Sequence, residues 1–207
     1  MEGKAGLIFF DFDGVIADSF AVAYETNLKI HPGMTEDEYR GAFEGNIYDW
    51  IKKMSHRALA GVDFMTEYER ETHRIDFFKE VEEVIPTLAS KYLLAIVSST
   101  TTQLIKRFLE REHLIQHFAD ILGADVHESK HQKMQDLIAK YHVSPRECVT
   151  ITDTTGDIRE ARMAGVDSIG VSWGFHSAET LEKANPIVIV FSPQELPKVV
   201  GDHFSKK

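Results

Sequence analysis

The sequence predicts an α/β protein in which a doubly wound parallel sheet carries a small all-helical cap, inserted after the first strand. Two observations favour this fold class. The apolar run at residues 7–10 stops at Asp11-Phe12-Asp13-Gly14, as expected for a strand that is buried on both faces and followed by a turn. From residue 81 onward, short apolar segments alternate with helical ones. We therefore expect a core formed by residues 1–16 and 81–207 and a cap formed by residues 17–80.

The cap segment carries helix signals throughout and no convincing strand. Thr35 and Glu38 have the spacing of a capping box, in which each side chain bonds the backbone N–H of the other residue. His31-Pro32-Gly33 and Gly41 are helix-ending signals. The expected helices cover approximately residues 18–30, 35–41, 46–57 and 64–78.

In the core segment each apolar strand is followed by a polar cluster or a turn. Thr100 and Gln103 have the spacing of a second capping box. Ligands of a parallel sheet bind beyond the carboxyl ends of its strands, so we expect the site where these polar clusters meet. The expected strands cover residues 92–97, 118–122, 148–151, 167–171 and 187–190, and the expected helices cover residues 81–90, 100–111, 129–141, 158–164 and 177–183, with one more after residue 192.

Composition restricts the classes of function. The 207 residues are 43% hydrophobic and 27% charged, which is normal for a globular protein. No apolar run approaches the roughly 18 residues that a membrane-spanning helix needs, so no membrane association is expected. The formal net charge of −10 disfavours nucleic-acid binding. Cys148 is the single cysteine, which excludes an intrachain disulfide and suits a cytoplasmic protein. Both a monomer and a homodimer are compatible with the sequence.

Asp11 and Asp13 are the first candidate functional residues. In an extended chain, side chains two residues apart project to the same side, so both carboxylates can face one pocket. Two acids this close repel each other unless a proton or a cation lies between them. For an isolated pair of this kind, a simple turn would be the better interpretation.

Four motifs in one order favour a catalytic site over a turn. They are Asp11-Phe12-Asp13-Gly14-Val15, the strand-end hydroxyl of Ser98, the helix-borne Lys130, and Asp153-Thr154-Thr155-Gly156-Asp157. Together they resemble the haloacid dehalogenase superfamily, in its phosphoglycolate phosphatase-like and β-phosphoglucomutase-like branch. The resemblance covers nearly all of the chain outside the cap segment and implies a Rossmann-like core.

The resemblance implies a role for each acid. Asp11 would be the nucleophile that forms an aspartyl-phosphate, and Asp13 would protonate the leaving group and later activate water. Dehalogenase relatives lack the second acid, so Asp13 favours phosphoryl transfer. Mg²⁺ would be the cofactor, since it prefers oxygen ligands. Asp11, the backbone carbonyl of Asp13 and Asp153 would bind it, and Asp157 would hold a bound water or the geometry.

By the same resemblance, Ser98, Ser99 and Lys130 would bind the transferring phosphate. The two serines could instead form a helix-capping cluster, and Lys130 could be an ordinary solvated lysine. Lys133, one turn further along, competes for the lysine role, but Ser129-Lys130 matches the family spacing better. Thr152 departs from the pattern, because many relatives have glycine at its position.

The cap would close over the site and contact the leaving group. Lys52 and Lys53 could equally be a solvated helix face, and the cap aromatics Trp50, Phe64, Phe77 and Phe78 are expected in the cap core rather than in a binding site. The histidines have no metal-ligand spacing. The candidates for contact with the leaving group are Arg40, Glu44, Asn46, Lys52 and Lys53.

The function expected from these observations is hydrolysis of a small phosphorylated metabolite, of the phosphoglycolate or sugar-phosphate type, through an aspartyl-phosphate and with Mg²⁺. Three alternatives remain. They are a phosphomutase of the β-phosphoglucomutase type, a phosphonoacetaldehyde hydrolase with Lys52 or Lys53 as its Schiff-base lysine, and a non-catalytic protein that binds phosphate or metal.

Overall fold

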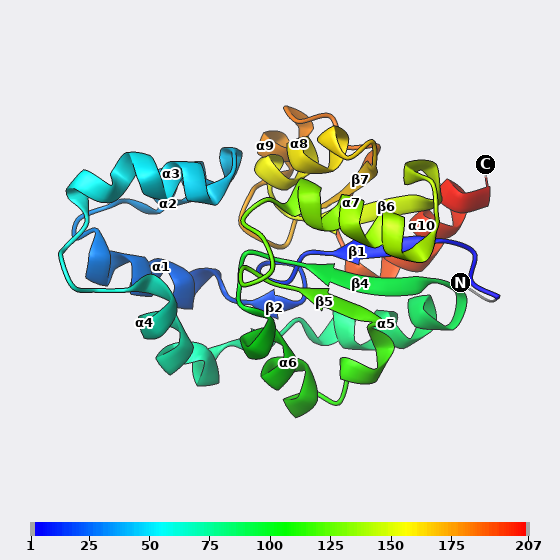
Figure 1. The fold of residues 1–207 in the computed structure, drawn as a ribbon, viewed down its shortest axis with the longest axis horizontal. Helices are drawn as coiled ribbons and strands as arrows, with labels where there is room; N and C mark the ends of the chain where they lie inside the picture. Colours follow the sequence, from blue (N-terminus) through cyan, green and yellow to red (C-terminus); the bar gives the residue numbers. More distant parts are fainter. Residues whose placement is uncertain (1–2, 206–207) are drawn as a thin grey trace.

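A computed structural model describes residues 3–205 of the chain. Six parallel strands form one sheet in the order β5-β4-β1-β6-β7-β8 (Figure 1), which confirms the predicted fold class. β1 is the central strand, and its Leu7 pairs with Leu93 on one side and Cys148 on the other. The strands are β1 (Leu7–Phe10), β4 (Leu93–Val97), β5 (Asp120–Leu122), β6 (Cys148–Thr152), β7 (Asp167–Val171) and β8 (Val188–Val190).

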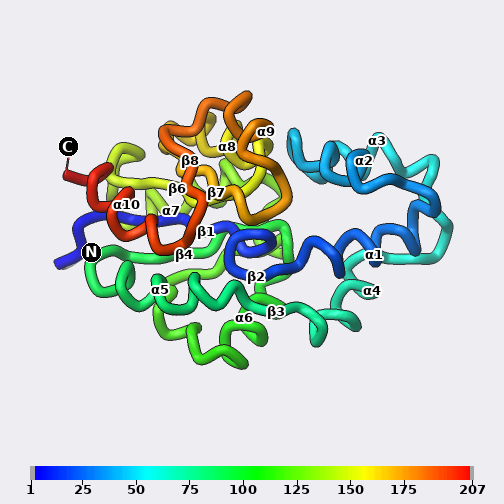
Figure 2. The backbone as a smooth tube through the Cα atoms, turned by 180° about the vertical axis from the view of Figure 1, so that it is seen from behind, coloured from blue at the N-terminus to red at the C-terminus, as the bar shows by residue number. Residues whose placement is uncertain are grey.

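The sheet is covered by helices on both faces because its strands are apolar on both faces. Leu7 and Phe9 belong to a buried cluster with residues of α7 and α8, whereas Ile8 and Phe10 belong to another with residues of α5, α6 and α10. Figure 1 shows the first face, and Figure 2 shows the opposite face from behind. The core helices are α5 (Lys79–Lys91), α6 (Thr102–Arg111), α7 (Lys130–Tyr141), α8 (Thr155–Met163), α9 (Ala178–Glu182) and α10 (Leu196–Ser205).

The cap lies beyond the carboxyl ends of the strands, at the left of Figure 1. Thr35 and Glu38 form the predicted capping box at the start of α2, with both of its hydrogen bonds present. Asn46 and Asp63 cap α3 and α4 through their side chains. The cap helices are α1 (Phe20–Ile30), α2 (Glu36–Gly41), α3 (Ile47–Met54) and α4 (Phe64–Glu71).

Short 3₁₀ turns join or end several of these helices. Ser144 and Ser192 each form a capping box at the start of such a turn. The turns are η1 (Ala42–Glu44), η2 (Ser55–Arg57), η3 (Thr72–Arg74), η4 (Ile115–His117), η5 (Pro145–Glu147) and η6 (Pro193–Glu195).

Two sequence predictions about local structure were wrong. The helix expected over residues 64–78 ends at Glu71, and the chain then forms β3 (Asp76–Phe77), which pairs antiparallel with β2 (Ala17–Asp18). These two strands, which join the cap to the core, are too short for a periodic pattern to reveal.

The second wrong prediction concerns the start of α6. Its N-cap is Thr101, and that side chain makes no capping hydrogen bond. Thr100 therefore does not form a capping box with Gln103. Within residues 3–205, no helix has the length and apolar content needed to cross a membrane.

Candidate active site

The predicted polar clusters meet at the carboxyl edge of the sheet. Asp11 and Asp13 follow β1, Ser98 follows β4, and Thr152 ends β6 directly before Asp153. Gly14 enables the sharp turn after β1, since its φ of +74° lies in the left-handed region and a Cβ at this position would overlap the Asp153 carboxylate. The motifs at the ends of β1 and β6 are therefore in direct contact.

Lys130 lies between two acids of these motifs. Its Nζ is 2.8 Å from Asp11 Oδ1 and 2.6 Å from Asp157 Oδ2, and all three side chains are nearly inaccessible to solvent. Ser129 accepts a hydrogen bond from Gln132 N as the N-cap of α7, which places Lys130 in the first turn of that helix. The structure thus puts Lys130 beside the predicted nucleophile.

Burial and neighbouring charges have opposite effects on the pKa values of Asp11, Asp157 and Lys130. Burial raises the pKa of Asp11 well above its usual range, although the Lys130 ammonium acts against the shift. Burial acts in the same sense on Asp157, but Lys130 and hydrogen bonds from its neighbours hold the pKa of Asp157 below its usual value. The pKa of Lys130 is raised, because the charges of Asp11 and Asp157 outweigh its burial. Lys130 therefore stays cationic.

Asp13 receives two short hydrogen bonds from hydroxyl groups. Tyr68 of α4 donates to Oδ1 at 2.6 Å, and Thr100 donates to Oδ2 at 2.6 Å. Burial, followed by the charge of Asp13, raises the pKa of Tyr68 well above its usual value, so this phenol remains a donor. Two separate segments, one in the cap and one after β4, thereby orient the Asp13 carboxyl group.

Asp153 is fully buried and its two oxygens have different surroundings. Oδ2 accepts a hydrogen bond from Phe175 N at 2.7 Å, whereas Oδ1 has no hydrogen-bond partner among the described residues. Burial raises the pKa of Asp153 to about 7. A buried carboxylate oxygen without a partner is costly unless a cation or a proton satisfies it.

The donor set around Asp153 fits Mg²⁺. Within residues 3–205, no group of three or more His, Cys, Asp or Glu side chains has a metal-holding arrangement. The predicted set does not depend on three such side chains, because it includes the backbone carbonyl of Asp13. The unpartnered Asp153 Oδ1 and the neighbouring Asp11 provide the hard oxygen ligands that Mg²⁺ prefers.

The two lysine candidates on α7 have different partners. Lys133 is fully buried, and its Nζ donates to the backbone carbonyls of Ser98 and Gly123. It connects the segments after β4 and β5 rather than contacting the acids. Lys130, which the resemblance favoured over its competitor Lys133, is the one in contact with Asp11.

The hydroxyl cluster after β4 divides into two environments. Ser98 is buried and its Oγ accepts a hydrogen bond from Thr100 N at 3.0 Å. Ser99 and Thr100 instead line a cavity that extends from the sheet edge into the cap. Phosphate binding by Ser98 and Ser99 stays a prediction.

Thr152, the departure from the family pattern, has a defined position. It is fully buried, and its hydroxyl donates to Asp157 Oδ2 at 2.8 Å. Asp157 Oδ2 therefore receives both the Thr152 hydroxyl and the Lys130 ammonium. The added side chain therefore contacts a predicted site residue.

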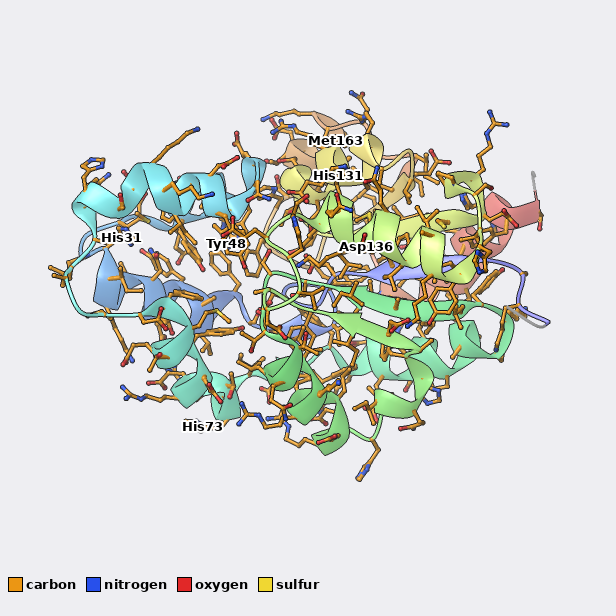
Figure 3. All side chains as sticks on the ribbon, in the orientation of Figure 1. His31, Tyr48, His73, His131, Asp136 and Met163 are labelled. Atoms are coloured by element: carbon orange, nitrogen blue, oxygen red, sulfur yellow. The ribbon has the colours of Figure 1, made fainter. Side chains whose placement is uncertain are left out.

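A cavity of about 450 Å³ extends from these residues into the cap. Figure 3 shows Tyr48 between α3 and the core and His31 at the far end of the cap, and both residues line the cavity. Its lining from the core is Asp11, Asp13, Ser99, Thr100, Lys130, Thr154, Asp157, Glu160 and Phe175.

Of the cap residues expected to contact a leaving group, Asn46 alone lies on the cavity lining. Its side chain donates to Glu160. Arg40 donates to the backbone carbonyl of Phe175, and the Glu44 carbonyl accepts a hydrogen bond from Thr155 at 3.5 Å.

Lys52 and Lys53 are exposed on α3, and Lys52 pairs with Glu128 at 3.3 Å. All four cap aromatics pack against the main buried cluster, which includes Tyr39 and Tyr68 of the cap. Trp50 and Phe64 also line the cavity, so they are not confined to the cap core as expected. The sequence analysis missed Tyr68 and Glu160 as site residues and assigned Thr100 to a helix cap.

Comparisons with known proteins agree with this geometry. Residues 8–171 match the family model described as haloacid dehalogenase-like hydrolase. The chain is 25% identical to phosphoglycolate phosphatase of Vibrio parahaemolyticus, covering 94% of this chain and 96% of that one. It is 30% identical to "Probable phosphatase IndB" of Dickeya dadantii, and the match covers 89% of this chain and 88% of that one. A crystal structure of a predicted phosphatase from Clostridium acetobutylicum superposes with a TM-score of 0.78 at 20% identity, covering 95% and 98%.

These matches confirm the expectation of an enzyme of the phosphatase type. The family model spans most of the chain, including the ends of β1, β4 and β6 and the start of α7. The structural superposition extends the agreement to the fold as a whole. The chain belongs to the haloacid dehalogenase-like hydrolase family.

Proposed function

We propose that this phosphatase hydrolyses a small phosphate monoester through an aspartyl-phosphate on Asp11, with Mg²⁺ as its cofactor. The observation that carries the proposal is the contact of Lys130 with Asp11 and Asp157 at a buried sheet edge, beside an Asp13 held by two hydroxyl groups. This arrangement combines a nucleophile, a fixed positive charge and a proton carrier.

The reaction divides into two displacements. A carboxylate oxygen of Asp11 attacks phosphorus, the bond from phosphorus to the leaving oxygen breaks, and the Asp13 carboxyl group gives its proton to that oxygen. Water then attacks phosphorus and passes a proton to Asp13 as the bond to Asp11 breaks, releasing inorganic phosphate. Lys130 faces the charge of the transferring group in both steps.

Bound Mg²⁺ would neutralise charge on the phosphoryl oxygens, so that an anionic nucleophile can approach an anionic ester. The ion would be held by Asp11, the Asp13 backbone carbonyl and Asp153. Asp157, which is itself positioned by its contacts with Lys130 and Thr152, would support this geometry. The unpartnered Oδ1 of Asp153 supports this assignment.

The structure lends no support to the phosphonoacetaldehyde hydrolase alternative. That reaction needs a lysine beside the substrate carbonyl, and Lys52 and Lys53 are exposed and absent from the cavity lining. The phosphomutase alternative uses the same core residues. Product analysis distinguishes it, because a mutase yields an isomeric sugar phosphate whereas a phosphatase releases inorganic phosphate.

The test is a phosphate-release assay over a panel of small esters with Mg²⁺. The panel includes 2-phosphoglycolate, the substrate that the name of the Vibrio relative suggests, and several sugar phosphates. Asp11→Asn should abolish turnover and phosphoenzyme formation from a radiolabelled ester. Asp136→Asn is the matched control, because Asp136 is exposed on α7 and bonds only its neighbour Gln132 among the contacts described (Figure 3). Full activity of Asp11→Asn would refute the proposal.

A further inference from the structure

The catalytic cavity extends into the cap, beside a helix whose apolar face is only partly covered by protein. Helix α3 carries Ile47, Trp50, Ile51 and Met54 at the spacing that creates one apolar face. None of the residues of α3 is buried, and Ile51 is 46% exposed. Trp50 and Met54 pack partly against the buried cluster, so the apolar face of α3 is covered on one side and left open along the rest.

The apolar face of α3 lines the catalytic cavity. Ile47, Trp50 and Ile51 lie on its wall, and Ile30 of α1 and Phe64 of α4 contribute to the same cavity. The remaining apolar lining from the cap comes from Ala23, Tyr39, Phe43, Ala58, Val62, Met65 and Tyr68. Away from the sheet edge, the cavity is therefore mainly apolar.

Polar groups in the cap part of the cavity are few and mostly engaged. His31 Nδ1 and Asn27 Oδ1 are 3.2 Å apart, and Asn27 Nδ2 bonds Met34 Sδ. Asp63 accepts from Thr66 N as the cap of α4. The buried Nε2 of His31 has no hydrogen-bond partner among the described residues, so the cap part of the cavity offers a ligand this one unpartnered buried atom and is otherwise mainly apolar.

The charges of the cavity oppose an anionic leaving group. Lys130 is the sole lysine or arginine among the described residues of the lining, and it is already paired with Asp11 and Asp157. Asp63 of the cap and Glu160 of α8, which accepts a hydrogen bond from Asn46, add negative charge to the lining. A carboxylate or a second phosphate placed in the cap would meet these acids without a compensating cation.

Arg40, which could have supplied such a cation, is directed elsewhere. Its guanidinium lies 3.7 Å from the centroid of the Phe20 ring and donates to the Phe175 carbonyl. It also pairs with Glu36 at 3.8 Å. The cap part of the cavity is therefore mainly apolar, whereas the part at the carboxyl edge of the sheet is charged.

We propose that the substrate is a phosphate monoester of an extended apolar alcohol, alkyl or aromatic, whose hydrocarbon part lies against α3 inside the cap. The inference rests on the proposed phosphatase function and names its substrate class. The volume of about 450 Å³ is within the usual range for ligand pockets and exceeds what a leaving group as small as glycolate occupies.

The test uses a homologous series of ethyl, butyl and hexyl phosphate. These alcohols have nearly the same acidity, so the chemical step is matched and differences in kcat/KM report contacts of the hydrocarbon chain. We expect kcat/KM to rise by about fourfold for each added methylene until the cavity is filled. Hexyl phosphate should also be preferred over 2-phosphoglycolate and glycerol 3-phosphate, which are polar and of similar reactivity.

A pair of variants separates the cavity from the rest of the cap. Ile51→Gln introduces an amide on the cavity wall and should lower the hexyl-to-ethyl ratio severalfold. Leu59→Gln is the matched control, because Leu59 is 51% exposed and outside the lining. It should leave the ratio within about twofold of the native value, as is usual for surface substitutions. Both side chains are substantially exposed, so both variants should fold.

The outcomes distinguish the two proposals. If the esters are hydrolysed but kcat/KM does not rise with chain length, or 2-phosphoglycolate is preferred, the apolar substrate class is refuted and the phosphatase function stands. If no ester is hydrolysed, including 4-nitrophenyl phosphate as a reactive reporter, both proposals fail. An equal effect of Ile51→Gln and Leu59→Gln on the ratio would also overturn the assignment of α3 as the binding surface.

Discussion

The clearest test of the catalytic assignment compares two lysines one turn apart on α7. Lys130→Met and Lys133→Met each replace a buried ammonium with an apolar side chain of similar length. Lys130 contacts Asp11 and Asp157, whereas Lys133 bonds only backbone carbonyls among the contacts described. The pair therefore separates loss of a catalytic charge from loss of a structural one.

The expected effect of Lys130→Met is on turnover. Its Nζ lies 2.8 Å from the predicted nucleophile, which is the position needed to stabilise charge on a transferring phosphoryl group. Removal of one such preorganised donor lowers kcat by about 100-fold to 1,000-fold.

Lys133→Met should mainly affect stability. It leaves the carbonyls of Ser98 and Gly123 without this donor, at about 1–3 kcal/mol for each buried group that stays unsatisfied. We expect kcat of the folded variant to fall by about tenfold at most, through displacement of the segment after β4. Burial and then the charge of Lys130 lower the pKa of Lys133 to about 8.

This lowered pKa gives Lys133 a signature in the pH dependence of stability. Between pH 8 and the ordinary lysine pKa of 10.5, the unfolded chain binds more protons at Lys133 than the native protein does. The contribution of Lys133 to the free energy of unfolding therefore rises with pH across this window, by up to about 3 kcal/mol. The difference in unfolding free energy between the native protein and Lys133→Met should grow accordingly.

The assay is steady-state phosphate release with Mg²⁺, combined with urea unfolding at pH 7, 8, 9 and 10. Circular dichroism checks that each variant is folded at the assay temperature. If Lys133→Met loses turnover while Lys130→Met keeps it, the assignment of Lys130 is wrong. Equal losses in two well-folded variants would likewise refute the reasoning.

Three further predictions concern residues around the same edge. Tyr68→Phe removes a hydrogen bond to Asp13 worth about 1.5–3 kcal/mol. In steady-state assays kcat/KM should therefore fall by about 10-fold to 100-fold. An unchanged kcat/KM would show that this contact is absent during turnover. Thr152→Val removes the hydroxyl bonded to Asp157 and should lower kcat by roughly tenfold, whereas Thr152→Ser should keep the native kcat. A serine variant as slow as the valine variant would contradict the role of the hydroxyl. Mg²⁺ at a hundredfold excess over its Kd should stabilise the native protein by about 2.7 kcal/mol in thermal unfolding, and the same shift in Asp153→Asn would exclude Asp153 as a ligand.

Much of the architecture follows from patterns that involve only neighbouring residues. The apolar run ending at Asp11 is buried on both faces as β1, and the Thr35–Glu38 capping box starts α2 as predicted. Parallel strands all end at one edge of a sheet, so strand-end polar clusters could be expected to meet there before any contact was known. This reasoning located Asp11, Asp13 and Asp153 correctly in the fold.

The errors occur where a residue has two competing partners. Thr100 has the right neighbour for a capping box, but its hydroxyl donates to Asp13, 87 positions away in the chain. Trp50 and Phe64 pack against the core and also line a cavity, a distinction that helical spacing cannot make. A separate error concerns β2 and β3, which pair where the cap joins the core, because neither strand is long enough for an alternating pattern.

From the order of its residues alone, this chain already specified a parallel sheet with acids at its edge, because periodicity and capping are local properties. The resemblance favoured Lys130 over Lys133, but the contact of Lys130 with Asp11 depended on how α7 docks against the sheet. The contact of Tyr68 with Asp13 spans 55 positions and depended on where the cap rests on the core. The apolar cap part of the cavity has the same origin, because whether an apolar helix face meets protein or an open cavity is set by the placement of its neighbours in space.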